Sequence, residues 1–84
     1  MTDVTIYLNR WCPFCTRALA LLDSKGVDYT AFDIEADPSL RQEMMQRSQR
    51  RTVPQIFIGQ THVGGCDELY ALERQGQLDT LLTS

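Results

Sequence analysis

The 84-residue sequence contains only three cysteines, Cys12, Cys15 and Cys66, and this odd number excludes a fully paired disulfide framework within one chain. Small secreted proteins that are held together by disulfides usually contain four, six or eight cysteines. In a reducing cytosol, thiols are more often catalytic or metal-binding than structural. We therefore expect these thiols to carry chemistry.

Long apolar runs and targeting signals are also missing from the sequence. No apolar run approaches the roughly 18 residues that a membrane-spanning helix needs. The first residues, MTDVTIYLN, lack the basic start and small-residue cleavage site of a signal peptide. We expect a cytoplasmic protein with no membrane partner. Its length and its apolar content of 43% predict one small domain covering residues 1–84.

The charges are few and acidic on balance, with 11 acidic and 8 basic residues and a net charge of −3. This balance argues against nucleic acid as a partner, because phosphate binding needs a basic surface. Lys25 is the one lysine, and four of the seven arginines lie between Pro38 and Arg51. Guanidinium groups bind carboxylates well, although a solvated helix face explains such a cluster equally well.

Hydrophobic spacing and turn residues predict an α/β protein. Short β-favouring runs predict strands at Val4–Leu8, Val27–Ile34, Gln55–Ile58 and Thr61–Val63. Pro13 and the pair Asp37-Pro38 mark two helix starts, and Gly26 is a natural stop for the first helix. Two further helices are predicted at Cys66–Arg74 and Leu78–Leu82. The order β-α-β-α-β-β-α-α gives a right-handed parallel βαβ unit followed by a hairpin, in a four-stranded mixed sheet flanked by helices.

The stretch Cys12-Pro13-Phe14-Cys15 follows a predicted strand and opens a predicted helix. The free N–H groups and the positive dipole end of the first helical turn favour thiolate over thiol at Cys12. Cys15 lies one turn further on the same face, close enough for a disulfide. A Cys-x-x-Cys pair in this βαβ setting indicates redox chemistry. Cys12 would attack substrates and Cys15 would resolve the intermediate.

A metal site is the alternative at this stage. Cys12, Cys15, His62 and Cys66 would together make a Cys₃His ligand set for zinc. The spacing of His62 and Cys66 is not that of a usual zinc knuckle, and Pro13 stiffens the first loop. We therefore expect no metal, and a solvent-exposed ring for His62 on its strand.

Three motifs in order resemble the glutaredoxin family. They are the Cys-Pro-Phe-Cys stretch at 12–15, Thr52-Val53-Pro54, and Gly64-Gly65-Cys66-Asp67. The resemblance runs from Val4 to about Leu82 and is closest to the small bacterial dithiol glutaredoxins of the glutaredoxin-three type. It implies the thioredoxin fold and a glutathione-dependent thiol–disulfide oxidoreductase, with glutathione as co-substrate and no tightly bound cofactor.

The resemblance also implies roles for individual residues. Pro54 would be a cis-proline facing the cysteine pair, and the backbone of Val53 would pair with extended glutathione. The N–H groups at Cys66 and Asp67 would bind the γ-glutamyl carboxylate, and Asp67 its ammonium group. A cation near Thr52, either Arg50 or Arg51, would bind the glycyl carboxylate. The expected glutathione contacts are Arg10, Phe14, Arg51, Thr52, Val53, Pro54, Gly65, Cys66 and Asp67.

The sequence departs from the family pattern at several positions. Phe14 keeps the ring but lacks the hydroxyl of the usual tyrosine, and Asn9 replaces a frequent lysine, so that Arg10 is expected to take over its contact. Trp11 is similar to the tryptophan that precedes the thioredoxin pair, and we expect it to pack beside the site. Cys66 is either a small residue at a helix start or a further reactive thiol.

The expected partners are glutathione and glutathionylated or disulfide-containing proteins, with ribonucleotide reductase as a target implied by the family. We expect a monomer. Two rival functions stay open at this stage. One is a thioredoxin-like electron donor recharged by a flavoprotein reductase. The other is a metal carrier in which two chains bridge an iron–sulfur cluster through Cys12 and glutathione, which the Cys-Pro-x-Cys turn disfavours.

Overall fold

A computed structural model describes residues 3–83, and these form four strands and four helices in the expected order. The strands are β1 (Val4–Leu8), β2 (Thr30–Asp33), β3 (Gln55–Ile58) and β4 (Thr61–Gly64). The helices are α1 (Pro13–Ser24), α2 (Pro38–Ser48), α3 (Cys66–Arg74) and α4 (Leu78–Thr83). In the described part of the chain, no helix is long and apolar enough to cross a membrane.

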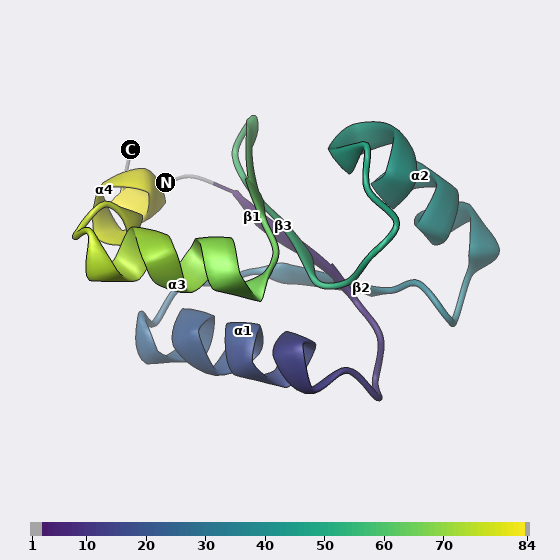
Figure 1. Ribbon diagram of the computed structural model, residues 1–84, viewed down its shortest axis with the longest axis horizontal. Coiled ribbons are helices and arrows are strands. Elements are labelled where there is room, and N and C mark those ends of the chain that lie inside the picture. The colour runs from purple at the N-terminus through teal and green to yellow at the C-terminus, as the bar shows by residue number, and fades with distance from the viewer. Residues whose placement is uncertain (1–2, 84) are drawn as a thin grey trace.

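The four strands form one mixed sheet in the order β2-β1-β3-β4. β1 pairs in parallel with β2 and antiparallel with β3, and β3 pairs antiparallel with β4. The sheet therefore contains a parallel βαβ unit and an antiparallel hairpin, as expected. Helices α1, α3 and α4 lie on one side of the sheet and α2 on the other (Figure 1).

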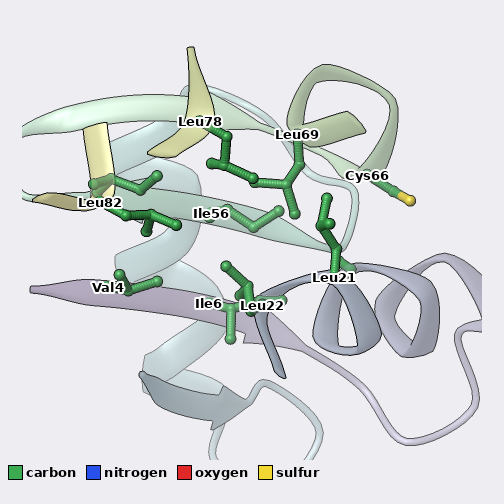
Figure 2. Close-up of a cluster of buried hydrophobic side chains, with 11 residues drawn as sticks. Val4, Ile6, Leu21, Leu22, Ile56, Cys66, Leu69, Leu78 and Leu82 are labelled. Atoms are coloured by element: carbon green, nitrogen blue, oxygen red, sulfur yellow. The ribbon is translucent and has the colours of Figure 1, made fainter. Parts of the chain in front are cut away.

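Alternation along the central strands divides the core between the two faces of the sheet. Val4 and Ile6 of β1 point toward α1, α3 and α4 and join the larger cluster, part of which Figure 2 shows. Tyr7 points the other way and packs with Phe57 and with Met44 of α2 in the smaller cluster. Cys66 lies at the edge of the larger cluster, so the start of α3 is anchored to the core.

Capping residues place the two helices that begin with proline. Asp37 is extended, and its carboxylate accepts a hydrogen bond from the Ser39 N–H at 2.9 Å, so α2 begins at Pro38. This hydrogen bond lowers the pKa of Asp37. Pro13 occupies the first helical position of α1, where its missing N–H costs nothing.

The second strand is shorter than the sequence predicts. β2 begins at Thr30 rather than at Val27, and its first pair is Thr5 with Thr30. In this register, residue 27 lies beyond the first residue of β1, which begins at Val4. Val27 and Tyr29 instead pack against the larger hydrophobic cluster. Their hydrophobicity reflects burial against the core and not membership of the strand.

Candidate active site

Cys12 lies at the N-terminus of α1, in the position that caps the helix. Its backbone is extended (φ −92°, ψ 111°), and its sulfur accepts a hydrogen bond from the Cys15 N–H at 3.2 Å. The Cys12 sulfur therefore faces the free N–H groups and the positive dipole end of the first turn of α1. The local sequence produces this geometry because Pro13 starts the helix directly after Cys12.

Cys15 lies one turn further into α1 and is almost fully buried, with 2% of its surface exposed. Burial raises the pKa of Cys15, and its hydrogen bond with Cys12 adds to the shift. Both thiols are free in the structure. The two cysteines therefore differ: Cys12 is partly exposed, whereas Cys15 is buried and its raised pKa keeps it protonated.

The loop between α2 and β3 lies opposite the cysteine pair. The Cys12 thiol donates a hydrogen bond to the Val53 carbonyl, with a sulfur-to-oxygen distance of 3.7 Å. The Val53–Pro54 peptide bond is cis, as the family resemblance implies. Cys12 and the Thr52–Pro54 motif, which are about 40 residues apart in the sequence, therefore meet at this site.

The turn after α2 determines that Arg50, and not Arg51, faces the Thr52–Pro54 loop and the cleft beside it. Gln49 has a left-handed backbone (φ 60°) and ends the helix. The buried Ser48 hydroxyl accepts the Arg50 N–H at 3.1 Å and lies 3.2 Å from the Arg50 carbonyl oxygen. These contacts fix the backbone of Arg50, whose side chain lines the cleft described below.

Gln55 and His62 stabilise the Thr52–Pro54 loop through hydrogen bonds. The fully buried Gln55 side chain donates to the Thr52 carbonyl oxygen at 2.9 Å and lies 2.7 Å from His62 Nε2. The His62 ring stacks on Phe57 with 4.8 Å between centroids, and burial lowers its pKa. The expectation of a solvent-exposed ring was wrong, because His62 is the partner that satisfies the buried amide of Gln55.

The third part of the site is the start of α3. Gly65 occupies the cap position, and its N–H donates to Glu68 Oε1 at 2.7 Å. The same oxygen accepts a hydrogen bond from Arg50 Nη1 at 2.9 Å. The bond from Gly65 and then the one from Arg50 lower the pKa of Glu68. Burial raises the pKa of Cys66, which is only 4% exposed.

A cleft of about 240 Å³ lies between these segments. It is lined by Phe14, Arg50, Thr52, Val53, Pro54, Gly65, Cys66, Asp67 and Glu68. Seven of the nine glutathione contacts predicted from the sequence are thus brought together. The other two, Arg10 and Arg51, are exposed and do not line it.

Glu68 is a cleft residue that the sequence reasoning missed, and Arg50 was weighed but not chosen. A signal for Glu68 was available, because an acid three residues after a helix cap commonly bonds back to the cap N–H. Arg50 and Arg51 could not be distinguished from sequence, since the choice depends on the left-handed Gln49 and on the contacts of Ser48.

Two aromatic side chains beside Cys12 are exposed. Trp11 is 81% exposed and Phe14 is 51% exposed. The Trp11 ring therefore does not pack beside the site as expected. The Arg17 guanidinium lies 6.0 Å from the Phe14 ring centre and 5.4 Å from that of Tyr70.

The four residues of the zinc alternative do not form one ligand group in the structure. Within residues 3–83, no group of three or more His, Cys, Asp or Glu side chains could hold a metal ion. His62, the histidine of that proposed ligand set, is instead hydrogen-bonded through Nε2 to Gln55 Oε1.

Comparison with known proteins agrees with the fold. The glutaredoxin family model matches residues 4–63. The chain is 52% identical to a glutaredoxin of Pseudomonas aeruginosa over 84 residues, which cover all of both chains. It is 54% identical to glutaredoxin 3 of Escherichia coli K12 over 82 residues, or 98% of this chain and 99% of the relative.

Solved structures show the same similarity. The solution structure of glutaredoxin from Brucella melitensis is 58% identical, with a TM-score of 0.85 over 98% of this chain and 89% of that one. The crystal structure of a buckwheat glutaredoxin–glutathione complex is 29% identical, with a TM-score of 0.89 over 98% of this chain and 77% of that one.

A four-stranded mixed sheet with a Cys-x-x-Cys pair at the start of its first helix defines a thioredoxin-fold oxidoreductase. The family model and the high identity to bacterial glutaredoxins make the assignment more specific. The chain belongs to the glutaredoxin family and is a glutathione-dependent thiol–disulfide oxidoreductase.

Proposed function

We propose that Cys12 is the nucleophile and Cys15 the resolving thiol of this oxidoreductase. The observation that carries this assignment is the position of the Cys12 sulfur, which caps α1, accepts the Cys15 N–H and faces the Val53 carbonyl at the cleft. Cys15 is buried and its pKa is raised, so it stays protonated while Cys12 reacts.

In the first half-reaction, the Cys12 thiolate attacks the glutathione sulfur of a protein–glutathione disulfide. A Cys12–glutathione disulfide forms, the protein–glutathione bond breaks, and the protein thiolate leaves and takes a proton from solvent. A second glutathione thiolate then attacks the glutathione sulfur on Cys12. Oxidised glutathione leaves and the Cys12 thiolate is regenerated.

A protein disulfide follows a related course. Cys12 attacks one sulfur of the disulfide, and one protein thiolate leaves while the other sulfur is joined to Cys12. Cys15 then loses its proton and attacks the Cys12 sulfur. The Cys12–Cys15 disulfide forms, and the second protein thiol is released.

We propose that glutathione lies in the cleft with its cysteine beside Cys12. The backbone of Val53 would hold the cysteinyl residue as a neighbouring strand would. The N–H groups at the start of α3 would bind the γ-glutamyl carboxylate, and Asp67 would bind the adjacent ammonium group. Support for this pose is that Thr52, Val53, Gly65, Cys66 and Asp67 line one cleft.

Two of the expected glutathione contacts, Arg10 and Arg51, do not line the cleft. Arg10 and Arg51 are exposed, and we propose that they attract the glycyl carboxylate, which would extend out of the cleft. The protein would act as a cytoplasmic monomer on glutathionylated or disulfide-containing proteins. Ribonucleotide reductase is the candidate target that the family resemblance implies.

The test is glutathione-dependent reduction of a glutathionylated peptide by the wild type, Cys12→Ser and Cys15→Ser. We expect activity to be lost in Cys12→Ser and kept in Cys15→Ser. A protein disulfide substrate should require both cysteines. Activity retained by a folded Cys12→Ser variant would contradict the assignment of the nucleophile, and an inactive wild type would overturn the proposed function as a whole.

A further inference from the structure

Arg50 and Glu68 form an ion pair that bridges the two walls of the cleft. Arg50 comes from the loop after α2, and Glu68 from the first turn of α3. Arg50 Nη1 lies 2.9 Å from Glu68 Oε1, which also accepts the Gly65 N–H at 2.7 Å. A single carboxylate oxygen therefore holds Arg50 beside the helix N-terminus.

The Glu68 side chain can take this position because Gly64 has no side chain. A Cβ atom at Gly64 would lie 2.5 Å from Glu68 Oε1 and 3.1 Å from its Cγ. The Glu68 side chain thus occupies the space that any other residue at position 64 would fill. This close fit fixes the carboxylate at the cap of α3, and through it the position of Arg50.

Stability alone does not explain the ion pair. The side chains of Arg50 and Glu68 are 49% and 44% exposed, and exposed pairs of this kind contribute little to folding. Both residues line the cleft, whereas the similarly exposed pair of Arg41 and Glu35 does not. The arrangement therefore points to ligand recognition.

We propose that Arg50, positioned by Glu68, binds the α-carboxylate of the γ-glutamyl residue of glutathione, and so selects the amino-acid end of this co-substrate. This inference rests on the proposed function. Around the start of α3, positive and negative groups lie close together: Arg50 and the helix N–H groups, then Asp67 and Glu68. A zwitterion with adjacent carboxylate and ammonium groups matches this arrangement. The assignment moves Arg50 from the glycyl end, where the sequence reasoning had considered it, to the γ-glutamyl end.

The test compares two mixed disulfides of one short peptide. In the first, the peptide cysteine is joined to glutathione. In the second, it is joined to γ-aminobutyryl-cysteinylglycine, which lacks only the α-carboxylate. The value of kcat/KM for the peptide reports the capture step, and it is measured for the wild type, Arg50→Gln, Arg50→Lys and Glu68→Gln.

We expect Arg50→Gln to lower kcat/KM about tenfold for the glutathione peptide, as for a charge-assisted hydrogen bond that is partly solvated. For the peptide joined to γ-aminobutyryl-cysteinylglycine, Arg50→Gln and the wild type should have equal kcat/KM. Arg50→Lys should recover part of the loss, because the charge returns without the planar fork. Glu68→Gln keeps an oxygen for the Gly65 N–H but weakens the hold on Arg50, so it should show a smaller loss with the same dependence on the carboxylate.

The matched control is Arg41→Gln, which removes the same charge from an ion pair with Glu35 outside the cleft. It should leave kcat/KM unchanged for both peptides. If Arg50→Gln leaves kcat/KM unchanged, or lowers kcat/KM equally for both peptides, the inference is overturned even though the enzyme is a glutaredoxin. If the wild type reduces neither peptide, the proposed function itself fails.

Discussion

Replacing Gly64 with alanine tests how closely Glu68 is packed at the start of α3. Gly64 has φ +113°, a value that side-chain-bearing residues rarely adopt, and the new Cβ would meet Glu68 Oε1 at 2.5 Å. The backbone strain costs about 1–3 kcal/mol. Displacing Glu68 from the Gly65 N–H removes a charge-assisted hydrogen bond, which costs about 1 kcal/mol after discounting for its solvent exposure.

The total expected loss in the free energy of unfolding is therefore about 2–4 kcal/mol. For a domain of this size, each kcal/mol shifts the melting temperature by about 4–8 °C. Urea unfolding and thermal scans measure both quantities. The value of kcat/KM for a glutathionylated peptide should also fall, because Glu68 no longer holds Arg50.

Gly76→Ala is the matched control. Gly76 also has a positive φ (+72°), but a Cβ added there would meet no atom of a residue beyond its chain neighbours within 4 Å. The substitution should cost only the left-handed strain of about 1–2 kcal/mol and leave capture of the peptide unchanged. If Gly64→Ala were as mild as Gly76→Ala in both stability and activity, the reasoning about Glu68 would be refuted.

Three further predictions concern the thiols, the acid stability and the core. At neutral pH, iodoacetamide should modify Cys12 well before Cys15 and Cys66, because burial raises the pKa of the latter two; equal rates by mass spectrometry would contradict this order. The lowered pKa of Glu68 in the folded state stabilises the protein fully above its unfolded pKa of about 4.3, and this contribution is lost as the pH falls through the folded pKa. Glu68→Gln should therefore flatten the fall in unfolding free energy below about pH 4.5, and an unchanged acid limb would show that Glu68 does not contribute. Leu22→Ala removes a fully buried side chain between α1 and the sheet and should cost about 2–5 kcal/mol in urea unfolding, whereas a loss below about 1 kcal/mol would mean that the site collapses around the cavity.

Much of the fold could be predicted from the sequence because its signals are local. Pro13 and Pro38 mark helix starts, and the described helices begin at these residues. The run from Val4 to Leu8 forms the expected central strand. The start of β2 could not be predicted in the same way. Val27 and Tyr29 are hydrophobic because they pack against the core, although they lie outside the strand.

The candidate site was partly predictable for a different reason. Cys12 and Cys15 are separated by one helical turn, so their relation follows from local geometry alone. The motif at Thr52–Pro54 was known only through the family resemblance. Its position opposite Cys12 depends on how β1, α1 and β3 pack, which no local pattern reports.

The sequence by itself determined the redox pair, the order of the elements and the residues available around them. Only the tertiary structure decided that Arg50 rather than Arg51 lines the cleft, that Glu68 reaches it, and that His62 supports Gln55. The physical reason is the distance along the chain. The Arg50–Glu68 contact joins residues 18 positions apart, and it forms because a left-handed turn at Gln49 and the absence of a side chain at Gly64 bring the two groups together.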